Sequence, residues 1–89
     1  MAVIEYQLKY PVDGEKGRIT VLRIRRPTFR DIKALGVLKK DMPEDALMEM
    51  MEKFICRLSG LSPEDANQLD LADFIPLTET ITGFFPETP

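Results

Sequence analysis

The spacing of apolar side chains changes at Pro27-Thr28, and this change constrains the fold more than any other feature of the sequence. Before it, apolar and polar residues alternate from Val3 to Tyr10, which is typical of a strand with one solvated face. After it, apolar residues recur every three or four positions, as in amphipathic helices. A chain of 89 residues is large enough for one modest core, so we expect a single domain over residues 1–89.

The expected β-hairpin occupies residues 1–26. Its first strand ends at Pro11, and Asp13-Gly14 followed by Gly17 predicts that the chain reverses between residues 12 and 17. The return strand, residues 18–26, changes its apolar face midway, which indicates either a bulge or burial on both faces. A two-stranded hairpin is marginal alone, so it must pack on helices or be extended by strands of another copy.

Helix signals fill residues 27–85. The first helix is predicted from Phe29 to Lys40, with Thr28 and Asp31 forming its capping pair. Gly36 within it marks either a close helix contact or a weak point. The second begins near Pro43, ends at Gly60, and carries the clearest buried stripe of the chain: Leu47, Met51, Phe54, Ile55 and Leu58.

A short helical turn is predicted after Ser62, and a last helix after Asp70. Pro76 should either kink that helix or start a new one, and residues 86–89 are expected to fray. The expected buried side of the last helix is Leu71, Phe74, Ile75, Thr78 and Ile81. The whole pattern predicts an α+β fold in which an N-terminal two-stranded antiparallel hairpin packs on three to four α-helices.

The sequence offers little reactive chemistry. It has no histidine and one cysteine, Cys56, so an internal disulfide and imidazole chemistry are excluded. Six of the fifteen carboxylates stand in predicted first helical turns, where backbone amides account for them: Asp31, Glu44, Asp45, Asp65, Asp70 and Asp73. Cys56 is expected to be a buried thiol, with neighbouring Arg57 as the one indication of activation. We therefore predict no catalytic residue, no metal site and no cofactor.

The start of the chain and its hydropathy indicate a location. Residues 1–10 lack a basic stretch followed by an apolar run, and no apolar run approaches the length of a membrane span. A cytoplasmic, reducing compartment is the expectation.

Charge is divided unevenly along the chain. Residues 1–40 hold ten Lys and Arg against four Asp and Glu, whereas residues 41–89 hold two against eleven. The two halves should attract each other, either within one molecule or between copies, and self-association is expected. The alternative is a small nucleic-acid-binding regulator that uses the basic face of residues 16–40, namely Arg18, Arg23, Arg25, Arg26, Arg30 and Lys33. A pI near 4.9 argues against general nucleic-acid binding.

Two clusters of adaptable apolar side chains are candidates for binding a partner. Met48 and Met50 belong to a methionine-rich stretch and fall at the margin of the predicted stripe, and Phe84 and Phe85 close the last helix. Each of the four could instead fill the core.

The order of these features resembles the small tail assembly chaperones of Mu-like contractile-tailed phages and related prophages, over roughly residues 4–85. The resemblance is carried by Leu22-Arg23-Ile24-Arg25-Arg26-Pro27-Thr28, Asp31, Arg57-Leu58-Ser59-Gly60-Leu61, Leu69, Asp70, Asp73 and Phe84. It implies a protein that binds the tape measure protein during tail assembly, keeps its hydrophobic helices from aggregating, and leaves before the tail matures. The tail tube protein is a second candidate partner. An enzyme accessory subunit is the remaining interpretation.

Overall fold

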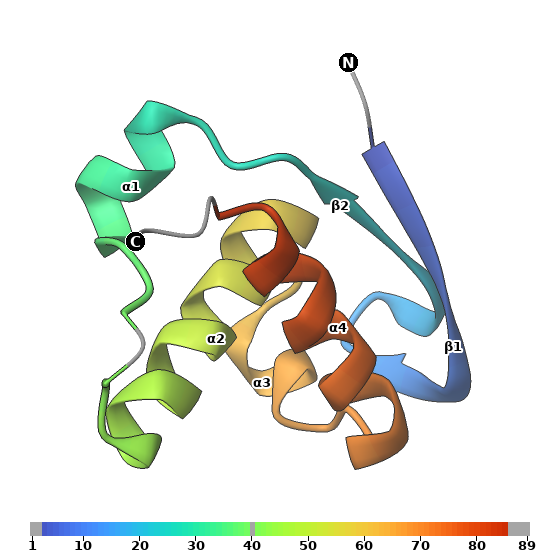
Figure 1. Ribbon diagram of the computed structural model, residues 1–89. Helices are drawn as coiled ribbons and strands as arrows, with labels where there is room; N and C mark the ends of the chain where they lie inside the picture. Colours follow the sequence, from blue (N-terminus) through green and yellow to red (C-terminus); the bar gives the residue numbers. More distant parts are fainter. Residues whose placement is uncertain (1–2, 40, 86–89) are drawn as a thin grey trace.

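The computed structural model describes residues 3–39 and 41–85, and within them the chain forms two strands followed by four helices (Figure 1). Strands β1 (Val3–Gly14) and β2 (Gly17–Arg25) form an antiparallel hairpin. The helices are α1 (Phe29–Leu35), α2 (Glu44–Ser59), α3 (Pro63–Ala66) and α4 (Leu71–Gly83). The predicted α+β class is confirmed, while the expected fraying of residues 86–89 lies outside the described part of the chain.

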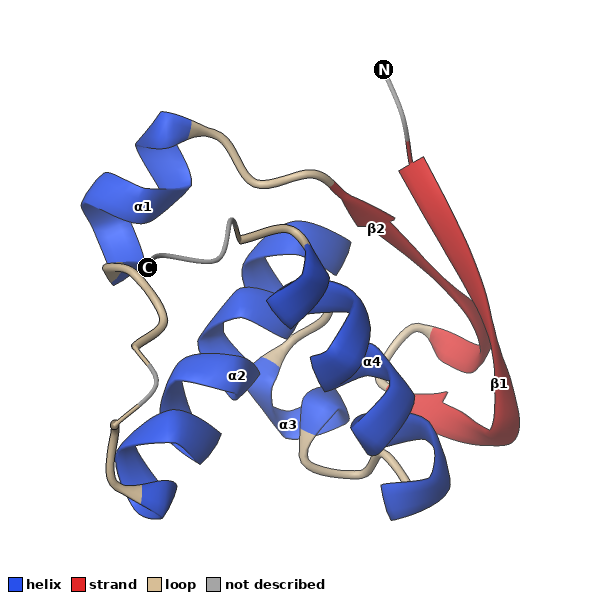
Figure 2. Ribbon diagram, in the orientation of Figure 1, coloured by secondary structure: helices blue, strands red, loops and turns tan. Residues whose placement is uncertain are grey.

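The hairpin and the helices share one apolar core. Helices α2 and α4 lie side by side, the hairpin curves along one side of them, and α1 stands at the edge of the molecule (Figure 2). Because each of these elements is too small to bury its apolar side alone, the core forms only where they meet. The buried side chains that form this core are Leu8, Val12, Leu22, Ile24, Met51, Phe54, Ile55, Leu58, Leu77 and Ile81.

Strand β1 is longer than predicted because the chain continues as a strand after a large bulge. Gln7 pairs with Val21 and Val12 pairs with Ile19, so residues 8–11 lie opposite Thr20 alone. Pro11 does not end the strand, since a bulge is one of the places where a proline leaves no ladder bond unmade. Around the bulge, Leu8 and Val12 are buried, whereas Tyr10 is exposed. The change of apolar face was predicted in the return strand instead, and there Leu22 and Ile24 are buried, Ile19 is half-buried and Val21 is exposed.

The carboxylate of Asp73 occupies this bulge. It accepts hydrogen bonds from the backbone amides of Lys9 and Tyr10, at 2.8 and 3.0 Å, and from the Tyr6 hydroxyl at 3.0 Å. Burial raises the pKa of Asp73, but these three donors outweigh burial and the pKa lies below its ordinary value. The first turn of α4 is thereby attached to β1, because the amides left without strand partners are satisfied by a side chain of the helix.

A second buried carboxylate, that of Asp31, joins the hairpin to α1 and α2. The Arg25 guanidinium binds both of its oxygens at 2.8 Å, Arg57 Nε lies 2.5 Å from Oδ1, and the backbone amide of Thr28 donates at 2.7 Å. The bidentate bonds from Arg25 hold the pKa of Asp31 well below its usual range, although burial acts in the opposite direction. Arg57, in the last turn of α2, therefore has a structural role as an ion-pair partner of Asp31.

Helix α1 is shorter than predicted. It ends at Leu35 because Gly36 adopts φ +94°, a conformation that side chains other than glycine rarely adopt. A Cβ at Gly36 would also lie 3.3 Å from Met50 Cε. Gly36 is thus both a helix terminator and a close contact between the α1–α2 connection and α2. The predicted extension to Lys40 is wrong.

The predicted stripe and left-handed cap of α2 are confirmed. Gly60 has φ +80°, and the stripe residues Met51, Phe54, Ile55 and Leu58 are buried, with Leu47 half-buried. Helix α4 is continuous through Pro76, so the proline does not split it.

The predicted buried side of α4 is correct at Ile81 and in part at Phe74, which packs against the core, but it is wrong at Leu71 and Ile75. The buried positions are Asp73, Leu77 and Ile81, whereas Leu71 and Ile75 are 70% and 53% exposed. The reason is the buried bond of Asp73 to β1, which an apolar pattern cannot indicate.

Replacing Asp73 by asparagine should lower the free energy of unfolding by about 2–4 kcal/mol, because an amide cannot accept all three hydrogen bonds in this buried site. Urea denaturation at neutral pH measures the effect. Asp70→Asn is the matched control: Asp70 caps the same helix through the Ala72 amide in an exposed position, and asparagine caps equally well. Equal losses in the two variants would contradict the role given to Asp73.

Stability should also decline in acid. The pKa values of Asp31 and Asp73 in the fold lie below the unfolded value of 3.8. Such carboxylates stabilise the fold above the unfolded pKa, and their contribution is lost as the pH falls through the folded pKa. We expect the free energy of unfolding to fall below about pH 5, and less steeply in Asp73→Asn. Urea titrations across this range measure it, and a flat acid profile would be the contrary result.

Candidate functional site

Two features of residues 3–39 and 41–85 bear on reactive chemistry, the grouping of acidic side chains and the Cys56 thiol. No group of three or more acidic or sulfur-bearing side chains there could hold a metal ion. Burial raises the pKa of the Cys56 thiol, the Glu52 carboxylate adds to the rise, and neighbouring Arg57 binds Asp31. A thiol of this kind carries less thiolate at neutral pH than a free cysteine, which is the opposite of an activated nucleophile.

The basic residues of the alternative nucleic-acid face are largely engaged with the protein itself. Arg25 binds Asp31, and Arg23 pairs with Glu5 at 3.0 Å. The Arg26 guanidinium lies 5.3 Å from the Phe84 ring centroid, and Lys33 Nζ lies 5.8 Å from that of Phe29. Arg18 and Arg30 are exposed on different elements, the hairpin and α1. These contacts divide the face into separate parts.

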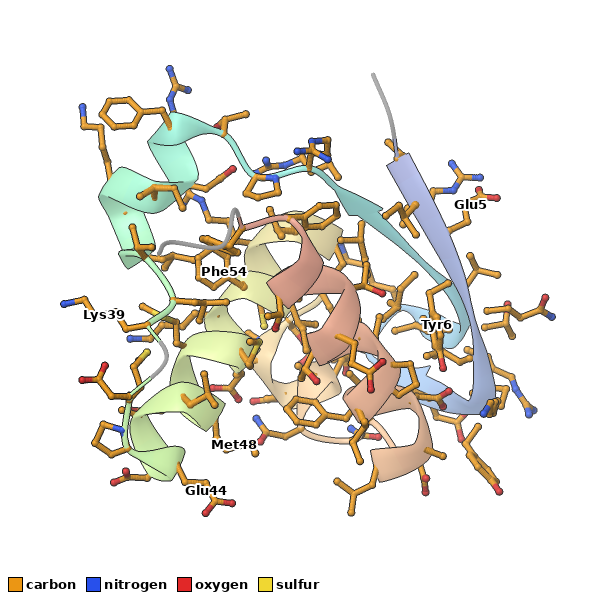
Figure 3. The ribbon with its side chains drawn as sticks, in the orientation of Figure 1. Glu5, Tyr6, Lys39, Glu44, Met48 and Phe54 are labelled. Carbon is orange, nitrogen blue, oxygen red and sulfur yellow. The ribbon has the colours of Figure 1, made fainter. Side chains whose placement is uncertain are left out.

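The four apolar residues predicted to bind a partner fall into different environments. Met48 is 46% exposed on α2, near Glu44 and on the other half of the helix from Phe54 (Figure 3). Met50 is half-buried beneath Gly36. Phe84 and Phe85 are half-buried against the core, and the Phe85 ring stands edge-on to Phe54 with centroids 5.4 Å apart.

Met48 lies in an open groove of about 400 Å³ between α2, α3 and the start of α4. Helix α2 contributes Met48 and Ile55 to its apolar lining, and α3 contributes Ala66. Leu71 and Phe74 come from α4, and Leu69 comes from the segment just before it. Three carboxylates, Asp45, Glu49 and Glu52, stand along α2, and Asn67 donates a hydrogen bond to Glu52. The groove therefore has an apolar floor and an acidic rim.

A second groove of about 420 Å³ runs along β2 between Ile19 and Leu61. Its charged residues, Glu5 and Arg23, pair with each other, so its rim carries no uncompensated charge. The acidic groove is the better candidate site because it offers both exposed apolar surface and unbalanced charge.

Leu71 and Ile75 form an exposed apolar ridge beside the acidic groove, which the sequence did not predict. Leu71 and Ile75 are one turn apart on α4, and both were assigned to the core. One sequence signal could have indicated it: α4 has more apolar residues than a single buried face needs. A helix that is apolar on two sides has one side left for a partner.

The ion pairs also bear on the uneven charge of the two halves. Among the described residues, the ion pairs join Arg23 to Glu5 and both Arg25 and Arg57 to Asp31. None of these joins a basic residue of the first forty to an acidic residue of the second half. Asp65 and Asp73 are buried, whereas the other acidic residues of the second half that the structure describes are at least partly exposed.

Comparison with known proteins identifies the family. Within the described residues, none of the helices has the length and apolar character needed to cross a membrane. Searches of curated proteins and of solved structures each gave no match. The family model described as "Phage tail assembly chaperone proteins, E, or 41 or 14" matches residues 5–86. Because this match covers nearly the whole chain and agrees with the resemblance found in the sequence, the chain belongs to the phage tail assembly chaperone family.

Proposed function

We propose that this chain binds the tape measure protein and keeps it soluble while a phage or prophage tail is assembled. Membership of the family supplies the role in tail assembly. The observation that supports the finer proposal is the acidic groove between α2, α3 and α4, where Met48 and Leu71 expose apolar surface that the core does not use.

The acidic groove has the properties of a helix-binding site. Met48 supplies a flexible, polarisable side chain that adapts to irregular apolar surfaces, which suits a client offering many similar helical segments. Leu71 and Ile75 form a ridge along α4 with helical spacing, on which an apolar stripe of a client helix can lie. Such a contact is small and open, so binding should be reversible, as a temporary chaperone requires.

The proposal includes the absence of covalent chemistry. It is supported by the raised pKa of the Cys56 thiol and by the engagement of Arg57 with Asp31. We place the action in the host cytoplasm, where tails assemble, and outside the mature virion. The tail tube protein is a second partner within the same proposal.

Co-expression with the tape measure protein of the same phage or prophage tests the function. The soluble fraction of the tape measure protein should rise several-fold with this chain, because its apolar helices would be covered. Measurement is by quantifying that protein in supernatant and pellet, with an unrelated acidic protein of similar size as the control. An unchanged soluble fraction would rule the proposal out.

Substitutions can separate binding from folding. Met48→Glu and Leu71→Glu should weaken binding of a tape measure fragment at least tenfold, about 1.4 kcal/mol, with little change in stability, because both side chains are exposed. Met50→Glu is the matched control on the same helix, and it should lower stability because Met50 packs beneath Gly36.

Phe84→Ala and Phe85→Ala complete this series. Weaker binding at unchanged stability assigns these rings to the partner surface, whereas lower stability assigns them to the core. Titration calorimetry and urea denaturation give the two readouts. Normal binding by both glutamate variants of the acidic groove would show that the client binds elsewhere.

A further inference from the structure

Helix α1 presents an aromatic ring to solvent between basic side chains. Phe29 is 77% exposed, the highest value among the large apolar residues described. Lys33 lies one turn further along, with Nζ 5.8 Å from the ring centroid, and Arg30 is exposed beside them. The other side of α1 is held by Asp31 and packs Ile32 and Leu35 on the core. Phe29, Arg30 and Lys33 form what we call the α1 knob.

The fold does not explain the α1 knob. An exposed ring in a seven-residue helix adds nothing to the core, and its exposure is unfavourable unless something covers it. The basic residues on both sides favour an acidic partner surface over a neutral one.

The acidic groove of the same chain has the complementary chemistry. Its floor is apolar and its rim carries Asp45, Glu49 and Glu52. No residue of α1 lines it, and Figure 1 shows α1 at one end of the molecule and the starts of α2 and α4 at the other. One copy therefore does not fill its own groove with its own knob. The charge division along the sequence matches these two surfaces: residues 1–40, which contain the α1 knob, are net basic, and residues 41–89, which contain the acidic groove, are net acidic.

We propose that a second copy of this chain docks its α1 knob in the acidic groove, with Phe29 against Met48 and Leu71 and the basic residues against the carboxylates. The contact joins two different surfaces, so it is head-to-tail and each docked copy leaves a free knob and a free groove. Association therefore grows with concentration, and salt weakens it because the charged rim is solvent-exposed. This goes beyond client binding and does not depend on the identity of the client.

Self-docking also protects the groove. Exposed Met48 and Leu71 are an aggregation hazard when no client is present, and an identical chain covers them reversibly. A client helix in the same groove would displace the knob and disperse the copies.

A charge exchange between the two surfaces provides the test. Arg30→Glu with Lys33→Glu makes the knob acidic, and Asp45→Lys with Glu49→Lys makes the groove rim basic. In each variant alone both surfaces then carry the same sign, and the concentration-dependent rise in average mass seen with the wild type should be lost. In an equimolar mixture every contact between unlike variants is again complementary, so assembly should return. Sedimentation velocity measures the mass.

The controls separate this contact from general effects of charge and folding. Lys16→Glu with Arg18→Glu changes the same number of basic residues at the hairpin turn and should assemble like the wild type, whereas Phe29→Ala should remain monomeric. Circular dichroism verifies folding of every variant. A wild type of one-chain mass at all concentrations, or a mixture that does not reassemble, overturns self-docking.

Client binding is a separate readout of the same samples. A monomeric wild type that still solubilises the tape measure protein overturns self-docking and leaves the proposed function standing. Assembly that follows the charge exchange, without any client binding, supports self-docking and overturns the proposed function instead.

Discussion

The arrangement of α1 and α2 depends on the hydrogen bonds and ion pairs that the buried carboxylate of Asp31 accepts. This carboxylate binds Arg25 at the end of β2, the first turn of α1, and Arg57 at the end of α2. A buried charge without partners costs several kcal/mol, and the donors from these three parts offset that cost. Helix α1 has seven residues and would not persist alone. Its attachment at Asp31 is what turns Phe29 outward.

Asp73 performs the corresponding role at the other end of the chain and decides which side of α4 is buried. Its carboxylate is held in the bulge of β1, and Leu77 and Ile81 follow at spacings of four residues on the same face. Leu71 and Ile75 are consequently turned to solvent, where they form the ridge beside the acidic groove. The exposed apolar surface is thus a product of a polar interaction inside the fold.

The residues that carry the family resemblance are mostly structural. Arg25, Thr28 and Arg57 bond to the buried carboxylate of Asp31, Gly60 caps α2, and Asp70 and Asp73 start and fix α4. Met48, Leu71 and the α1 knob lie outside that pattern. A motif of this kind therefore reports the fold of the chaperone, and the surfaces proposed here for binding lie outside it.

The sequence alone determined the hairpin, the four helix starts, the stripe of α2 and the left-handed cap at Gly60, because periodicity and capping are local properties of the chain. It indicated either a bulge or burial on both faces in the return strand, whereas the bulge lies in β1. Only the tertiary structure decided the length of β1, the end of α1 at Gly36, the buried side of α4 and the acidic groove. The length of β1 and the buried side of α4 depend on bonds between residues far apart in sequence, such as Tyr6 with Asp73, which no local pattern contains. Helix α1 ends where Gly36 adopts a positive φ and closely approaches Met50 of α2.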